Sequence, residues 1–146
     1  MCAACLQEYQ DPGDRRFHGQ GINCQSCGPQ LSYVDPQGKV LSRKEQALTD
    51  TISALRAGHI LAIKGLTGFH LVVDATNHNA VLRLRKRKQR PAKPFALMYP
   101  ELSMLAADCF LTDKEKSLLS SEIAPIVLLE NRYSNHALRP AIAPHT

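Results

Sequence analysis

The stretch GHILAIKGLTGFHLVVDATNHNAVLRLRKRK, residues 58–88, decides how the larger part of this chain folds. Two short runs rich in β-branched and aromatic residues, 59–65 and 69–75, are separated by the tripeptide LTG and predict a pair of strands. Asn77 is a favoured helix N-cap residue, and apolar residues recur behind it at helical spacing. The stretch therefore predicts a strand, a second strand and a helix in succession.

The flanking segments extend this pattern. Residues 47–58 have helical periodicity and end on a glycine, which is typical of a helix C-terminus. Prolines on either side of residue 93 predict the end of a helix and a new strand at 95–98. A capping-box pair predicts a helix near 111–119, and the apolar run 124–130 predicts another strand. The fold class expected is α/β or α+β.

The basic charge of the chain is concentrated in one place. The formal net charge is +5 over 146 residues, but seven of the 18 Lys and Arg residues lie between Arg83 and Lys93. Outside that segment, 13 acidic residues outnumber 11 basic ones. This distribution predicts a local patch for an anion such as phosphate. With no apolar run near 18 residues and no signal-peptide pattern, we expect a soluble, cytoplasmic chain with no membrane partner.

Four cysteines form two Cys-x-x-Cys knuckles separated by 18 residues. This spacing suits one tetrahedral Zn²⁺, and four thiolates leave no open position for substrate, so a structural site is predicted. A free-thiol or redox pair is the alternative, but the βαβ pattern that accompanies such pairs is missing. We expect Cys109, which stands apart, to be buried as a small hydrophobic residue. The predicted metal ligands are Cys2, Cys5, Cys24 and Cys27.

The residues between the knuckles offer few further ligands. His18 is expected to be a surface or packing histidine, since four cysteines already complete the metal site. Arg15 and Arg16 either contact an anion or pair with nearby acidic residues, and we favour pairing. The predicted domains are a zinc-finger module at 1–34, a linker at 35–46 and a second unit at 47–146.

The basic run has three possible interpretations: a nuclear-localisation or nucleic-acid patch, a solvated helix face, or a phosphate cradle. Val81 and Leu84 are expected to face inward on the helix, so surface charge explains part of the run. It does not explain the cations that continue past Pro91, near a helix C-terminus where they can converge on a triphosphate. These cations are Lys88, Arg90 and Lys93.

The turn between the two predicted strands is a second candidate site. Its glycines allow a ligand to approach the backbone closely, although a plain hairpin turn explains them equally well. Lys64 lies between apolar neighbours and is a candidate anion contact, whereas His70 is as often a core residue as a ligand. The candidate set is Lys64, Gly65, Gly68 and His70.

Residues 5–31, 58–98 and 118–130 together resemble successive segments of the HypF-type hydrogenase-maturation carbamoyltransferases. The resemblance covers nearly the whole chain, and it corresponds to the second four-cysteine finger and the first part of the YrdC-like domain of that family. It implies a twisted open sheet with flanking helices, incomplete in this chain. It also implies that the zinc is structural.

The resemblance implies a reaction as well. HypF-type proteins make a carbamoyl-adenylate from carbamoyl phosphate and ATP, with Mg²⁺, and pass the carbamoyl group to the partner HypE for the cyanide ligands of [NiFe]-hydrogenase. By the same resemblance, Lys88, Arg90 and Lys93 would hold ATP phosphates, while Lys64, Gly65, Gly68 and His70 would receive the carbamoyl donor. Thr67 stands where the family usually has glycine, and its side chain would narrow the approach to the backbone.

Two rival interpretations remain at this stage. YrdC-like domains are associated with double-stranded RNA and transfer RNA, so a zinc-containing RNA-binding module is the alternative function, although the basic run contains no aromatic residue to stack on bases. A remnant that binds only zinc is the other. Because the family's preceding and following domains are not present, we expect a fragment with little or no activity by itself.

Overall fold

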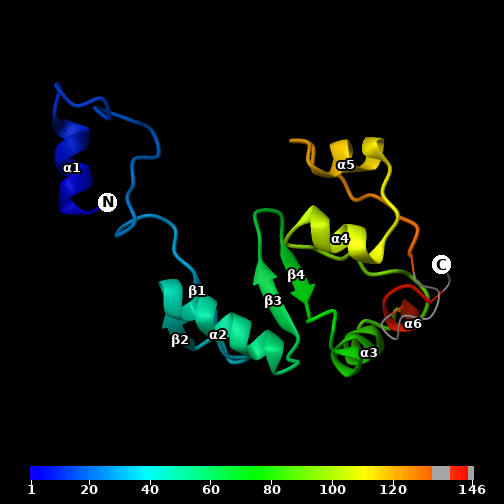
Figure 1. Ribbon diagram of the computed structural model, residues 1–146. Helices are drawn as coiled ribbons and strands as arrows, with labels where there is room; N and C mark the ends of the chain where they lie inside the picture. The colour runs from blue at the N-terminus through cyan, green and yellow to red at the C-terminus, as the bar shows by residue number, and fades with distance from the viewer. Residues whose placement is uncertain (133–138, 145–146) are drawn as a thin grey trace. The chain divides into compact units, whose positions relative to one another are not determined.

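A computed structural model describes residues 1–132 and 139–144 of the chain (Figure 1). The chain divides into two compact units, Met1–Ala54 and Leu55–Thr146. The mixture of short helices and small antiparallel sheets confirms the expected mixed α and β class. In the described part of the chain, no helix is both long enough and apolar enough to cross a membrane.

The first unit starts with helix α1, Ala3–Gln10, which the sequence pattern did not predict. Strands β1, Ser32–Val34, and β2, Val40–Arg43, pair antiparallel around a turn in which the Asp35 carboxylate accepts hydrogen bonds from two backbone N–H groups. Helix α2, Lys44–Arg56, follows directly. The segment 35–46, expected to be a turn or linker, thus holds a turn, strand β2 and the start of a helix.

Helix α2 begins three residues before the predicted position, and Gly58 lies just beyond its end with φ +80°, as expected of a C-terminal glycine. Ala47 is the buried residue of this helix, whereas Leu48 and Ile52 are half exposed. The apolar stripe that predicted the helix is therefore open to solvent in the described chain.

The second unit contains the predicted hairpin and helix. Strands β3, Leu61–Lys64, and β4, Phe69–Val72, pair antiparallel in continuous register. Helix α3, His78–Arg87, begins at Asn77, whose side chain accepts a hydrogen bond from the Ala80 N–H. The three predicted elements of residues 58–88 are confirmed.

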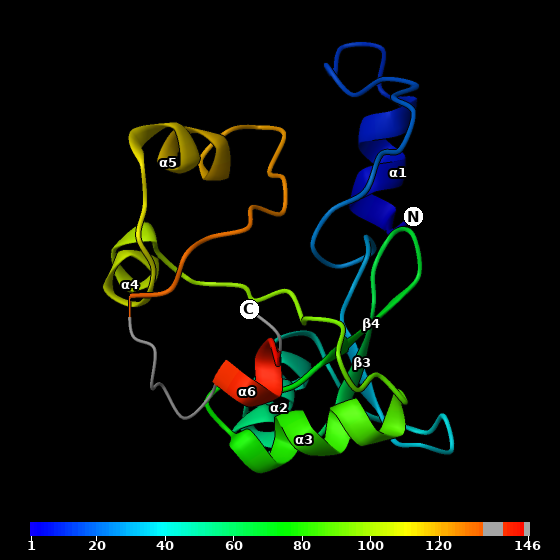
Figure 2. The same ribbon diagram turned by 90° about the vertical axis from the view of Figure 1, so that its right-hand side faces the viewer.

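Part of the buried core of the second unit lies between α3 and a short helix, α6, Arg139–Ile142. These two helices lie side by side in both views (Figures 1 and 2). Val81 and Leu84 are buried on the inner side of α3, as the helical periodicity predicted, and Ala141 is buried on α6. This contact joins the end of the described chain to the basic helix.

Two further helices follow α3 along the chain. Helix α4, Leu102–Asp108, was not predicted, whereas α5, Asp113–Leu119, begins with the predicted capping box: Thr112 and Glu115 exchange side-chain and backbone hydrogen bonds. Cys109 is buried after α4, in agreement with its expected packing role.

Two predicted strands are wrong. Residues 95–98 and 124–130 form no strand in the described chain, although Phe95 donates its N–H to the Ile142 carbonyl and Cys109 forms an isolated bridge with Asn131. A strand needs a neighbour that accepts and donates its backbone hydrogen bonds, and no described segment pairs with either run along its length. The described β structure is two two-stranded sheets.

Candidate metal centre and candidate phosphate site

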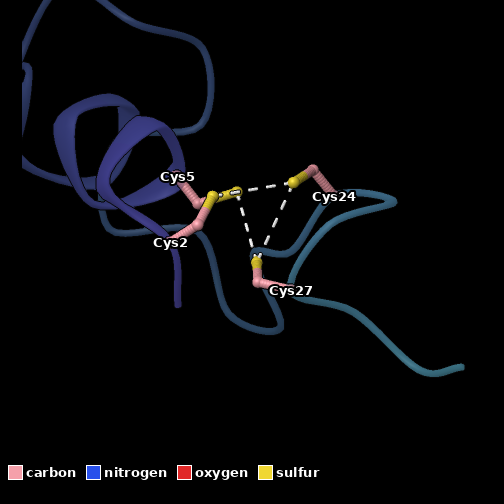
Figure 3. A group of neighbouring side chains, drawn as sticks. All are labelled: Cys2, Cys5, Cys24 and Cys27. Carbon is pink, nitrogen blue, oxygen red and sulfur yellow. Dashed lines mark hydrogen bonds between the residues drawn. The ribbon is translucent and has the colours of Figure 1, made fainter.

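The first two cysteines are placed by helix α1. Cys2 is the N-cap residue and Cys5 lies in the first turn, so a spacing of three residues puts both side chains on one face of the helix. Cys5 is buried, while Cys2 is partly exposed. Figure 3 shows the two sulfurs directed toward the second knuckle.

The second pair of cysteines lies on a tight turn. The Gly28 N–H donates to the Cys24 carbonyl at 2.7 Å, which closes the turn around Cys27. A Cβ at Gly28 would lie 2.5 Å from the Asn23 Oδ1 and 2.8 Å from the Cys24 carbonyl oxygen, so this position requires glycine. The turn holds both thiols on the side that faces α1 (Figure 3).

The four sulfurs have the spacing of a tetrahedral metal site. The Sγ atoms of Cys2 and Cys24 lie 3.7 Å apart, those of Cys24 and Cys27 3.9 Å, and those of Cys27 and Cys5 3.7 Å. All four lie within 4.8 Å of one another. Zn–S bonds of about 2.3 Å at the tetrahedral angle put ligand sulfurs about 3.8 Å apart. The donor set and its spacing therefore fit a closed tetrahedral site.

The surroundings act differently on the individual thiols. Burial raises the pKa of the Cys5 thiol to about 12. By contrast, a hydrogen bond from the Ser26 N–H to the sulfur lowers the pKa of Cys24 to about 6, and backbone hydrogen bonding also lowers the pKa of Cys27. Backbone hydrogen bonds in the second knuckle thus favour the thiolate forms of Cys24 and Cys27, whereas burial disfavours the thiolate form of Cys5.

His18 and Arg16 of the finger both have structural partners. The His18 ring stacks on Tyr9 with a centroid distance of 4.8 Å, which agrees with the expected packing role. Arg16 pairs with Glu8 at 2.6 Å and donates to the Asn23 carbonyl at 2.7 Å. The preference for acidic pairing over anion binding is confirmed for Arg16.

The hairpin residues gather at the β3–β4 turn. The Gly65 N–H donates to the Gly68 carbonyl at 2.7 Å, and Gly68 has φ +145°. A Cβ at Gly65 would lie 3.2 Å from the His70 Nε2, so the imidazole packs against this backbone. Lys64, Thr67 and His70 are exposed. The turn chemistry explains both glycines, and ligand binding by this set stays a prediction.

The three predicted phosphate ligands lie in the segment that follows α3, residues 88–95, here called the basic loop. Lys88 and Lys93 are exposed. Arg90 is partly buried, and its guanidinium donates to the carbonyls of Lys93 at 3.2 Å and Pro94 at 2.6 Å. Among the described residues, no carboxylate pairs with either lysine ammonium group, while the Arg90 side chain holds the shape of the loop.

The hairpin set and the basic loop are separate groups in the described chain, where no hydrogen bond or ion pair links them. The residue that sequence reasoning missed is Arg85, which it counted as part of the basic run. Arg85 is only 8% exposed. Its position one residue after Leu84 and four after Val81, on the inner side of α3, was the available signal.

The chain consists of two modules. The first is a four-cysteine finger, and in the second a β hairpin precedes a basic helix. Residues 1–34 match the family model described as the HypF finger, and residues 53–146 match the Sua5, YciO and YrdC model described as telomere recombination. The chain therefore belongs to the HypF family.

Individual relatives agree with this assignment. The chain is similar to carbamoyltransferase HypF of Rhodobacter capsulatus, with 48% identity over 98% of this chain and 19% of the relative. Carbamoyltransferase HypF of Synechocystis is 47% identical over 98% of this chain and 25% of the relative. The chain thus spans about a fifth to a quarter of the length of these curated relatives.

Solved structures of HypF proteins resemble the chain as well. The crystal structure of T. kodakarensis HypF superimposes with a TM-score of 0.77 at 33% identity, over 99% of this chain and 19% of that one. Full-length HypF in the phosphate- and nucleotide-bound form gives a TM-score of 0.69 at 38% identity, over 92% of this chain and 17% of that one.

Proposed function

We propose that this chain supplies the zinc finger and the ATP-phosphate-binding part of a carbamoyltransferase. The complete reaction would form a carbamoyl-adenylate from carbamoyl phosphate and ATP and deliver the carbamoyl group to a HypE-type partner, for the cyanide ligands of [NiFe]-hydrogenase. The observation that carries the proposal is the order of a HypF finger and a YrdC-type unit along one chain, together with 48% identity to a named carbamoyltransferase.

In this proposal, Cys2, Cys5, Cys24 and Cys27 hold a structural Zn²⁺. The four sulfurs fit tetrahedral coordination, and a fourfold thiolate site has no position left for water or substrate. The zinc would supply folding energy, because the first unit has Cys5 and Ala47 as its only buried apolar residues in the described chain. The role of the zinc would therefore be structural: it would join α1 to the knuckle at residues 24–27.

The basic loop would bind the phosphates of MgATP. Lys88 and Lys93 are exposed ammonium groups that offer point charges, and Arg90, whose Nε and Nη2 atoms donate to carbonyls of the loop, would add a guanidinium charge held in place. These cations would offset the negative charge that develops when the α-phosphate is attacked. A HypF protein similar to this chain has been solved in a phosphate- and nucleotide-bound form, which supports nucleotide binding as a function of the family.

The hairpin turn would receive the carbamoyl donor. Gly65 and Gly68 remove side chains from the turn, so an anionic donor can approach the backbone, and Lys64 offers a nearby charge. His70, which packs against Gly65, would hold the turn in shape. Thr67 places an exposed side chain in this turn, and replacing it by glycine should tighten binding of the donor.

A chimera tests the proposed reaction. Residues 1–146 would replace the matching segment of Rhodobacter capsulatus HypF, and carbamoyl-phosphate-dependent exchange of ATP with pyrophosphate would be measured. The chimera should remain active. Because a charge-assisted hydrogen bond contributes about 1.5–3 kcal/mol, Lys88→Ala and Lys93→Ala should each reduce exchange roughly 10- to 100-fold.

The matched control is Lys86→Ala, which removes an exposed charge from the last turn of α3, outside the basic loop. This variant should stay within twofold of the unmodified chimera. Equal losses in all three variants would show a general charge effect and contradict the assignment of the loop. An inactive chimera that binds zinc normally would contradict the proposed reaction itself.

Double-stranded RNA is the second candidate ligand. Two observations favour it. Three consecutive basic residues are exposed to solvent: Lys86, Arg87 and Lys88. No described carboxylate lies within ion-pair distance of them. Counterion release would make RNA binding fall steeply with salt, by a log–log slope of about 0.9 per phosphate contact. Salt-sensitive binding of RNA without discrimination for ATP would favour this function over the first.

A further inference from the structure

Arg85 is the buried charged residue of the described chain. It lies in the last turn of α3 with 8% of its surface exposed, among Val81, Leu84 and Ala141 of the core. No described carboxylate pairs with it. A guanidinium cannot lose its charge at ordinary pH, so its burial requires compensation by other polar groups.

Backbone carbonyls supply that compensation. The Nη1 atom donates to the carbonyls of Arg90 at 2.5 Å and Lys93 at 3.0 Å, with Pro91 at 3.5 Å. The Nε and Nη2 atoms donate to Ala141 at 2.8 and 2.7 Å, and Nη2 also donates to Ile142 at 3.0 Å. The guanidinium therefore joins the basic loop to α6.

Two further contacts close this arrangement. The Arg85 guanidinium lies 4.5 Å from the centre of the Phe95 ring, and the Phe95 N–H donates to the Ile142 carbonyl at 3.0 Å. Residues 90–95 of the basic loop are thus held by contacts with Arg85 and Ile142. Burial lowers the pKa of Arg85, which agrees with a desolvated cation that depends on these carbonyl dipoles.

The direction of the carbonyls matters for an anion site. Arg85 and the Arg90 side chain together bind four of the five carbonyl oxygens of residues 90–94. Carbonyl oxygens carry partial negative charge and repel phosphate, so a phosphate-binding loop needs them turned inward. Meanwhile Lys88 and Lys93 remain exposed.

We propose that Arg85 is a positioning residue of the basic loop. By drawing the carbonyls of residues 90, 91 and 93 toward the core, it leaves the lysine ammonium groups to face the anion. Its action on phosphate binding rests on the function proposed above. A lysine cannot replace it, since one ammonium has three donors at a single point whereas the guanidinium spreads five donors over a planar fork.

The test compares Arg85→Lys with two control variants of the zinc-loaded 146-residue chain. Arg87→Lys makes the same chemical change at an exposed position of α3, and Val81→Ala weakens the same core without touching the loop. Hydrogen exchange would be followed at the amides of Arg90 and Phe95, which are bonded to the carbonyls of Arg85 and Ile142. Affinity for MgATP would be measured by calorimetry.

Arg85→Lys should accelerate exchange at both amides at least tenfold and weaken MgATP binding at least tenfold. Arg87→Lys should leave both measurements within twofold. Val81→Ala should lower the melting temperature while keeping MgATP affinity within threefold, because loss of stability alone does not reorient the carbonyls. This pattern would establish the positioning role.

Three outcomes would overturn the positioning role of Arg85. Unchanged exchange in Arg85→Lys would overturn the proposal, as would faster loop exchange with unchanged MgATP affinity, or equal losses of affinity in Arg85→Lys and Val81→Ala. If the unmodified chain bound no MgATP, the proposed function would fail. In that case faster exchange in Arg85→Lys would still support the effect of Arg85 on the loop, and unchanged exchange would refute it.

Discussion

The contact between Gly58 and Asn77 makes Gly58→Ala a sharp test of how α3 is held. Gly58 has φ +80°, and a Cβ placed there would lie 2.7 Å from the Asn77 Nδ2. Asn77 is the N-cap of α3, the helix that leads into the basic loop, and its Oδ1 accepts from the Ala80 N–H at 3.0 Å. The methyl group must therefore displace the cap.

The magnitude has two parts. Alanine in the left-handed region costs about 1 kcal/mol, and loss of the Asn77 cap costs about 1 kcal/mol more. Gly58→Ala should thus lower the free energy of unfolding by about 2 kcal/mol, and Asn77→Ala by about 1 kcal/mol. In the double variant the clash has no partner, so the total should be about 2 rather than 3 kcal/mol.

Urea unfolding of the zinc-loaded chain, followed by far-ultraviolet circular dichroism, measures these values. Gly38→Ala is the control, since Gly38 has φ +86° with no atom within 4 Å of the added Cβ, and it should show only the conformational cost of about 1 kcal/mol. A Gly58→Ala variant within 0.5 kcal/mol of the parent chain, or strict additivity in the double variant, would refute the reasoning.

Three further outcomes are expected. The chain should bind one zinc, and replacing any one of the four cysteines by serine should abolish stoichiometric binding, as measured by atomic emission; full occupancy in a variant would contradict the site. Thr112→Ala should destabilise α5 by about 1 kcal/mol through loss of the capping box, visible as faster amide exchange at Glu115. The Ser42 hydroxyl donates to the Asp50 carboxylate at 2.5 Å and lowers the pKa of that carboxyl. This bond therefore stabilises the fold at pH values above the ordinary aspartate pKa, and its contribution is lost as the pH falls through the lowered pKa. The stability difference between the parent chain and Ser42→Ala should therefore be constant near neutral pH and shrink below about pH 4, and a constant difference down to pH 2 would contradict this.

The sequence correctly predicted the elements that are specified by side chains close together in the chain. The capping box of α5 and the Asn77 cap of α3 use side chains that satisfy nearby backbone N–H groups, so their spacing is enough to find them. The β3–β4 hairpin was found for the same reason, since its two strands are joined by a short turn. Helix α1 was missed because its apolar residues are mostly consecutive, Ala3–Leu6, and do not form a stripe at helical spacing.

The same patterns failed where pairing partners matter. Residues 95–98 and 124–130 have the apolar character of strands, but in the described chain they find no neighbour along their length. Ile126 and Leu128 remain more than 80% exposed. Hydrophobic pattern reports which residues can be buried, whereas a strand forms only when another segment completes its hydrogen bonds.

For the candidate sites, sequence alone determined the four cysteines of the finger, the local concentration of positive charge and the glycines of the hairpin turn, because spacing and composition carry these features. Only the tertiary structure decided which of the basic residues exposes its charge to solvent, where an anion can reach it. In the sequence, Arg85, Arg90 and Lys93 are all simply cations of one basic run. In the structure, the Arg85 guanidinium is buried, the Arg90 guanidinium donates to carbonyls of its own loop, and the Lys93 ammonium is exposed. The reason is that a cation's role depends on the carbonyls and solvent around it, and folding brings Ala141 and Ile142 to Arg85 across more than 50 residues of chain.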